Sequence, residues 1–155
     1  MNAVTFSDNF APFGGAIFSY SNTSGLVVTN STFVGNSACN GGTIWNNPNA
    51  SATVTNSTFS ENSATYAGGA IENMGGSLSV SFSTFSGNAA PQGGAIFTST
   101  NFLDSPGSFA VQSTLFANSS SGGNCYFGTP TTVQSGGTTF PAIALAPPFS
   151  PPQAT

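Results

Sequence analysis

The sequence contains no lysine, no arginine and no histidine, and its only charged side chains are four acids among 155 residues. These acids are Asp8, Glu61, Glu72 and Asp104. Nucleic-acid binding depends on Lys and Arg, so the composition excludes DNA and RNA as partners. The same absence argues against electrostatic docking on anionic membranes. No apolar run is long enough to span a bilayer, so we expect no direct membrane insertion of this segment.

Strong helix formers are also scarce, because Lys and Arg are missing and Glu occurs only twice. In their place stand 19 glycines and many Ser, Thr and Asn residues. Gly has a high backbone entropy cost in a helix, and Ser, Thr and Asn compete for backbone hydrogen bonds. Helical repeats and leucine-rich repeats are therefore excluded, and an all-β chain is favoured.

What the sequence does contain is a pair of motifs that recurs. Phe-x-x-Asn is followed a few residues later by Gly-Gly-Ala-Ile or Gly-Gly-Thr-Ile, and the motif phenylalanines recur every 26 or 27 residues. They are Phe6, Phe33, Phe59 and Phe85, and a degraded fifth copy has Leu115 and Asn118 in place of Phe and Asn. This period is too short for a propeller blade and fits one coil of three short strands. We predict a right-handed single-stranded parallel β-helix of about five coils, each about 26 residues long.

An alternating pattern before each Phe-x-x-Asn predicts the strands, as in Ser77-Leu78-Ser79-Val80-Ser81. Alternation places one set of side chains inside and the other outside. Stacked coils bring equivalent residues above one another at a spacing of about 4.8 Å. The predicted core ladders are Val28/Val54/Val80/Val111, Phe33/Phe59/Phe85/Leu115 and Ile17/Ile44/Ile71/Ile96.

Two further columns are polar or small, and we interpret both as structural. The motif asparagines predict a ladder in which each side-chain amide bonds to the neighbouring coil. Its members are Asn9, Asn36, Asn62, Asn88 and Asn118. The glycine pairs mark a corner that needs either a positive φ or a close backbone approach.

The repeats predict one domain over residues 1–128, followed by a partial last coil and a Pro-rich tail over residues 129–155. Five of the ten prolines lie between Pro141 and Thr155, and a central strand tolerates none. The chain begins inside a repeat and has no recognisable signal peptide. We therefore expect this segment to be a fragment or a truncated gene product, with any export signal encoded outside it.

The two cysteines, Cys39 and Cys125, fall in coils about three steps apart, which corresponds to about 14 Å along the axis. That separation is beyond the reach of a disulfide, so we expect two free thiols. Two distant thiols and four scattered acids make no ligand set for a metal. We predict no metal and no cofactor.

The recurring Phe-x-x-Asn and Gly-Gly-Ala-Ile motifs resemble the repeats of chlamydial polymorphic outer membrane proteins. The coil that begins at Val54-Thr-Asn-Ser-Thr-Phe also looks like those of bacterial right-handed parallel β-helix repeat proteins. The resemblance covers about residues 2–128. It implies an extracellular or outer-surface passenger, often adhesive and sometimes followed by an autotransporter barrel or another anchor. We do not assign adhesion to the motif residues, because they coincide with the columns that build the coil.

Some parallel β-helices cleave polysaccharides, so catalysis has to be considered. A lyase would need a basic residue, and the chain has none. Glycoside hydrolysis needs two carboxylates about 5–9.5 Å apart. Asp8 and Glu61 share a repeat position two coils apart, hence about 9–10 Å, but Gly35 lies between them instead of a water-positioning group. We predict that the chain is not an enzyme, and polysaccharide binding or degradation remains an alternative.

The residues that directly follow the buried isoleucines form a second candidate site. They are Phe18, Trp45, Glu72 and Phe97. If Ile points inwards, its neighbour points outwards, so Phe18, Trp45 and Phe97 would form an exposed aromatic ridge. Such a ridge suits a cell-surface glycan or a protein partner. Reversed parity, or cover by the loop at residues 46–51, would bury it instead.

A third candidate is a row of threonines, because flat Thr rows on solenoids bind ice. The row comprises Thr32, Thr58, Thr84 and Thr114, partnered by Ser31, Ser57, Ser83 and Ser113. A double Thr row would be a stronger signal than this one. The sequence thus predicts a non-enzymatic, surface-exposed or secreted β-helix passenger with a structural or adhesive role, and ice binding is the second alternative.

Overall fold

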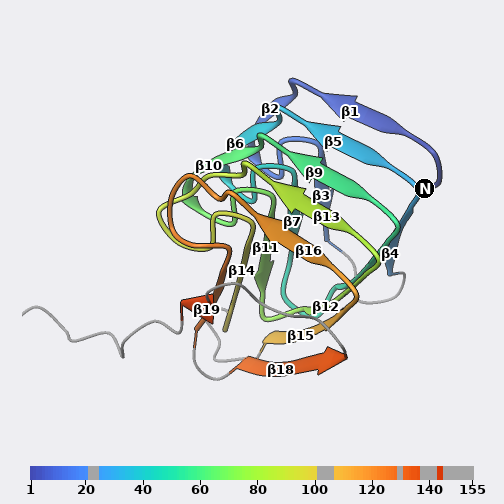
Figure 1. Cartoon of the computed structure of the whole chain (residues 1–155), viewed down its shortest axis with the longest axis vertical. Helices are drawn as coiled ribbons and strands as arrows, with labels where there is room; N and C mark the ends of the chain where they lie inside the picture. The colour runs from blue at the N-terminus through green and yellow to red at the C-terminus, as the bar shows by residue number, and fades with distance from the viewer. Residues whose placement is uncertain (21–24, 101–106, 129–130, 137–142, 145–155) are drawn as a thin grey trace, which may run out of the picture.

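The computed structural model describes residues 1–20, 25–100, 107–128, 131–136 and 143–144. Over these ranges the chain has strands and no helix, and it winds into a parallel β-solenoid (Figure 1). The predicted all-β parallel β-helix is confirmed. The solenoid has about four turns, slightly fewer than the five expected, because the coil that begins at Met1 and the last described coil are both partial. The predicted Pro-rich tail lies outside the described residues, apart from Ile143–Ala144.

Four parallel sheets wrap around the core, and each is named here by its first strand. In spatial order the β1 sheet comprises β1 (Thr5–Ser7), β5 (Thr32–Val34), β9 (Thr58–Ser60), β13 (Thr84–Ser86) and β16 (Leu115–Ala117). The β2 sheet comprises β2 (Phe10–Phe13), β6 (Ser37–Asn40) and β10 (Ser63–Ala67). The β3 sheet comprises β3 (Ile17–Ser19), β7 (Ile44–Asn46), β11 (Ile71–Met74), β14 (Ile96–Ser99), β17 (Cys125–Phe127) and β19 (Ile143–Ala144). The β4 sheet comprises β4 (Leu26–Thr29), β8 (Ser51–Thr55), β12 (Ser77–Ser81), β15 (Gly107–Gln112) and β18 (Thr131–Gly136).

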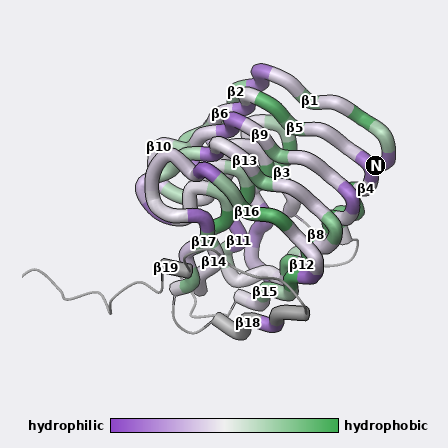
Figure 2. The backbone as a smooth tube through the Cα atoms, in the orientation of Figure 1, coloured by the Kyte–Doolittle hydropathy of each residue, from purple (hydrophilic) through white to green (hydrophobic). Residues whose placement is uncertain are grey.

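The β2 sheet was not expected, since three strands per coil were predicted. It forms because the segment between the Asn corner and the Gly-Gly corner is straight enough to pair with its equivalents in the next coil. A coil therefore contributes up to four strands. Hydrophilic residues recur at corresponding corners of successive coils, as the hydropathy colouring shows (Figure 2).

The interior is filled by stacked apolar columns in the predicted register. The valine column runs through Val28, Val54, Val80 and Val111, and the isoleucine column through Ile17, Ile44, Ile71 and Ile96 to Cys125. Phe59 stacks between Phe33 and Phe85, with ring centroids 4.6 and 4.7 Å apart. Burying one such side chain contributes about 1.5–3 kcal/mol, so the columns stabilise each coil.

The fifth copy of the repeat is shifted by one residue from the predicted alignment. Phe85 pairs with Phe116, and Thr84 pairs with Leu115. Phe116 is 1% exposed and continues the phenylalanine column, whereas Leu115 is 57% exposed. Val111 and Phe116 keep the five-residue offset of Val80 and Phe85, which preserves the corner between the two strands. The prediction of Leu115 as a core residue is therefore wrong.

One corner of every coil uses a left-handed backbone between the β4 sheet and the β1 sheet. Asn30, Asn56 and Phe82 occupy this corner with φ of 51°, 49° and 50°. The side-chain amide of Asn56 donates to Asn30 Oδ1 at 2.7 Å, which links the corners of two coils. The side chain of Phe82 is 57% exposed, so its ring is not part of the core.

Replacement of Phe82 by Asn is expected to stabilise the chain by about 1 kcal/mol. An L-residue in the left-handed region costs about 1–2 kcal/mol, and Asn tolerates this region better than Phe does. The new amide would also extend the link between Asn30 and Asn56. Thermal unfolding followed by circular dichroism measures the change, and a melting temperature below that of the wild type would contradict the expected relief of strain.

Candidate functional site

The motif asparagines form a buried, hydrogen-bonded ladder. The Nδ2 groups of Asn9, Asn36 and Asn62 donate to Oδ1 of the next asparagine at 2.9, 3.1 and 2.9 Å. The backbone N–H of each of these three residues donates to the same Oδ1 atom as its own side-chain amide does. Asn36, Asn62 and Asn88 are 0% exposed, so this column builds the coil and presents no polar group to a ligand.

Asn118 does not join this ladder, contrary to the prediction. It is exposed, with φ of 54°, and it directly follows Ala117, whose carbonyl accepts from Gly87 N–H. Asn118 therefore occupies the left-handed corner that Asp8, Gly35, Glu61 and Gly87 occupy in the other coils, with φ of 55°, 65°, 56° and 66°. The cause is the same one-residue shift that places Phe116 in the core.

The predicted aromatic ridge follows the outer face of the β3 sheet, and only its first half is accessible. Phe18 is 48% exposed and stacks on the half-buried Trp45, with ring centroids 4.8 Å apart. Glu72 is 2% exposed, which interrupts the ridge. Phe97 is 8% exposed and stacks on Tyr126 with ring centroids 5.0 Å apart, so it does not contribute to the exposed part.

Two aromatic residues that sequence reasoning missed complete the accessible part. Phe13, at the end of β2, lies 5.2 Å from Trp45 and 6.3 Å from Phe18 between ring centroids. Tyr20 lies 6.0 Å from Phe18. We call Phe13, Phe18, Tyr20 and Trp45 the aromatic cluster. Tyr20 was detectable in the sequence because it stands two residues after Phe18, and continued alternation would place it on the same side.

Glu72 is a buried carboxyl group beside the aromatic cluster. Burial raises its pKa from 4.5 to about 7. The side chains of Asn40 and Trp45 and the backbone of Gly41 interact with the carboxyl and lower the pKa, but by less. Its Oε2 is buried without a hydrogen-bond partner. Alternation placed Glu72 in an outward-facing column, but the corner at Asn40 and Gly41 covers it there.

This burial predicts a loss of stability on raising the pH. The folded state holds the Glu72 proton up to pH about 7, whereas the unfolded chain releases it near 4.5, so stability falls as the pH rises between these values. The difference corresponds to about 3 kcal/mol. Glu72→Gln is expected to remove this pH dependence in urea unfolding, and Glu61→Gln is the matched control at an exposed position. Equal pH profiles for Glu72→Gln and the wild type would contradict the assignment.

Asp8 and Glu61, the candidate hydrolytic pair, are both exposed at left-handed corners of the same column. Gly35 lies in the coil between them and offers no side chain to hold water. No group of three or more His, Cys, Asp or Glu residues that could hold a metal occurs in the described part of the chain. Asp104 lies outside the described residues.

The threonine row lies on the outer face of the β1 sheet, but not as predicted. Thr5, Thr32 and Thr58 are exposed and Thr84 is half-buried, after which Leu115 continues the column instead of Thr114. The partner serines face inwards, and their hydroxyls donate to backbone carbonyls two residues back. These are Ser31, Ser57 and Ser83, and Thr114 takes the equivalent place in the next coil. The row is therefore single.

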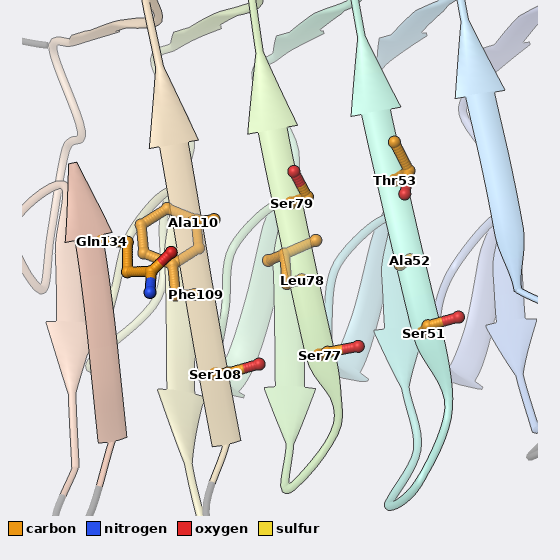
Figure 3. A pocket seen from close by; sticks show the side chains of 10 residues that line it. All are labelled: Ser51, Ala52, Thr53, Ser77, Leu78, Ser79, Ser108, Phe109, Ala110 and Gln134. Atoms are coloured by element: carbon orange, nitrogen blue, oxygen red, sulfur yellow. The ribbon is translucent and has the colours of Figure 1, made fainter. Parts of the chain in front are cut away.

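A shallow hollow of about 250 Å³ lies over the β4 sheet. Figure 3 shows its lining residues, which come from β8, β12, β15 and β18. They are Ser51, Ala52, Thr53, Ser77, Leu78, Ser79, Ser108, Phe109, Ala110 and Gln134. No lining residue is ionisable, so the hollow is a hydroxyl-bearing, uncharged surface without an acid or a base for catalysis.

Both cysteines are free thiols, as expected. Cys125 is buried in the isoleucine column, and burial raises the pKa of its thiol well above the ordinary range. Cys39 is half-buried in β6. A protonated, buried thiol is a poor nucleophile, so Cys125 acts as a small apolar residue of the core.

Comparison with known proteins identifies the repeats. Residues 3–20, 56–73 and 82–99 match the family model described as the Chlamydia polymorphic membrane protein repeat. Each matched segment contains one Phe-x-x-Asn motif and the Gly-Gly-Ala-Ile that follows it. No curated protein and no solved structure matches the chain. Among the residues that the structure describes, no helix is long and apolar enough to cross a membrane.

Proposed function

We propose that this chain, a polymorphic-membrane-protein-like repeat protein with a parallel β-helix fold, is a non-enzymatic passenger at the outer cell surface or outside the cell. Its role is structural and adhesive. The repeat match supports an outer-membrane or surface location, because the family is named for membrane proteins. The partner that we propose is a cell-surface glycan or protein.

The observation that carries this proposal is how the chain uses its polar residues. The side chains of the motif asparagines and of the inward serines form hydrogen bonds within and between coils, so they are not available to a ligand. The described outward faces carry hydroxyls, amides, the exposed carboxyls of Asp8 and Glu61, and the aromatic cluster. Such a surface offers hydrogen bonds and apolar contact to a partner. It has no Lys, Arg or His, and only Gly35 lies between its two exposed carboxyls, which suits recognition and not group transfer.

Beads coated with the purified chain test the adhesive role on cultured mammalian cells. The native chain is expected to bind more beads per cell than either heat-unfolded chain or serum albumin. Binding at the albumin level would overturn the adhesive role. Release of reducing sugar from polysaccharides, with loss of this activity in the Asp8→Asn, Glu61→Gln double variant, would establish the degradative alternative instead.

The exposed row of Thr5, Thr32 and Thr58 keeps ice binding as a second candidate. Thermal hysteresis measures it directly. Thr58→Leu is a suitable variant because Leu115 already occupies the same column in a later coil, so the fold accepts leucine at this position. Hysteresis in the wild type that this variant abolishes would favour ice binding, and its absence in the wild type would remove the candidate.

A further inference from the structure

We propose that the aromatic cluster of Phe13, Phe18, Tyr20 and Trp45 is a binding site for a neutral hexopyranose unit of a glycan. The inference deepens the proposed function, on which it rests, by naming the ligand class and the residues. It also replaces the longer ridge that the sequence suggested with a compact site at the first two coils.

The cluster is the one place in the described surface where exposed aromatic rings contact one another. Phe13 and Phe18 are each 48% exposed, and Tyr20 is 74% exposed. Their ring centroids form a connected set with Trp45, at separations from 4.8 to 6.3 Å. Scattered exposed apolar residues are ordinary, but a contiguous patch marks an interaction site.

The repeat does not require aromatic residues at these positions. In the Phe13 column the next coils carry Asn40 and Ala67. In the Phe18 column Trp45 is followed by the buried Glu72, which separates the cluster from Phe97 and Tyr126 further along the column. The cluster thus spans two coils, about one strand spacing of 4.8 Å. That length fits one sugar ring. It is too short for an amphipathic helix, whose anchors recur over several turns.

The chemistry around the rings favours a neutral, hydroxyl-rich ligand. The chain has no cationic side chain, so neither an anionic sugar nor an acidic peptide would find a counter-charge. The accessible polar groups next to the rings are uncharged: they are the Tyr20 hydroxyl and the half-buried Asn47, whose backbone N–H donates to the carbonyl of Ser19 at 3.0 Å. The carboxyl of Glu72, which also lies beside the cluster, is buried. A pyranose presents C–H groups that pack on aromatic faces and hydroxyls that bond to such groups.

Trp45 is held in place by a neighbour in the next coil. The side chains of Asn40 and Trp45 both interact with the carboxyl of the buried Glu72. Glu72 and Asn40 are therefore positioning residues that fix the indole while its accessible edge remains at the site. A ring whose rotamer is fixed before binding loses less conformational entropy when the ligand packs on it.

Fluorescence tests this directly, because Trp45 is the only tryptophan of the chain. The purified chain is titrated with methyl glycosides of glucose, galactose, mannose and N-acetylglucosamine, and with short oligosaccharides of each. We expect a saturable change in Trp45 emission with at least one of them. The Phe18→Ser, Tyr20→Ser double variant is expected to bind about tenfold more weakly or not at all.

The matched control is Phe82→Ser, which removes an exposed phenylalanine elsewhere and introduces the residue that Ser113 supplies in the same corner column. It should bind like the wild type. No change in emission across the panel, with native circular dichroism, would overturn the inference. An emission change that follows protein concentration and not sugar concentration would also overturn it, in favour of self-association. If beads still bind cells in either case, the adhesive proposal survives without this site.

Discussion

Asn62→Ala is expected to lower the free energy of unfolding by about 4 kcal/mol, because it breaks the buried ladder at its centre. Asn62 Nδ2 donates to Asn88 Oδ1 at 2.9 Å and to the carbonyl of Phe33 at 3.1 Å. Its Oδ1 accepts from the backbone and the side chain of Asn36 at 3.0 and 3.1 Å. Alanine replaces none of these bonds, and each unpaired buried group costs about 1–3 kcal/mol.

The measurement is urea unfolding at constant pH, with Asn118→Gly as the control. Asn118 is exposed at a left-handed corner, and glycine adopts this backbone conformation without strain. The free energy of unfolding of the control should therefore lie within about 0.5 kcal/mol of the wild-type value. Because coils are stabilised by their neighbours, loss at Asn62 should loosen the adjoining coils as well. Equal losses of stability for the two variants would contradict the structure, in which Asn62 belongs to the ladder and Asn118 does not.

Gly69→Ala is expected to destabilise the chain by at least about 4 kcal/mol or to prevent folding. A methyl group at Gly69 would overlap the carbonyl oxygens of Gly94 and Ala89 in the next coil. Both are backbone atoms and cannot rotate away. The coils would have to separate, which breaks the bond from Gly69 N–H to Gly93 O at 3.1 Å.

Gly87→Asn provides the contrast for a glycine in a different setting. Gly87 has φ of 66°, but a methyl group there would meet only Glu61 atoms at 3.6 and 3.8 Å, and Asn118 already occupies the same corner in the next coil. The variant should fold with a melting temperature close to that of the wild type. Wild-type stability for Gly69→Ala would contradict the close approach of the coils at the Gly-Gly corner.

Most of the fold follows from local pattern in the sequence. Alternation in stretches such as Ser77–Ser81 specifies which side chains point inwards, and a constant period stacks like on like. That reasoning failed where the period changed. Ser83 and Thr114 are equivalent although they are 31 residues apart, so counting from the asparagines misplaced Leu115 and Asn118 by one residue.

The candidate site was harder to predict, because it depends on contacts between different sides of a coil. Alternation correctly placed Phe18 and Trp45 outside, but it could not show that the corner at Asn40 folds over Glu72. Nor could it show that Phe13, from another sheet, packs on Trp45. The serine row was misplaced because a left-handed corner such as that at Asn56 turns the chain, and alternation does not continue through it.

The most direct test of a surface-exposed passenger is the accessibility of the folded solenoid on intact cells that produce it. Antibodies raised against the purified chain are applied to intact and to permeabilised cells, with an antibody to a cytoplasmic protein as the control for intactness. A surface role predicts equal labelling of intact and permeabilised cells, or recovery of the chain in the medium. Labelling that appears only after permeabilisation would contradict the central claim.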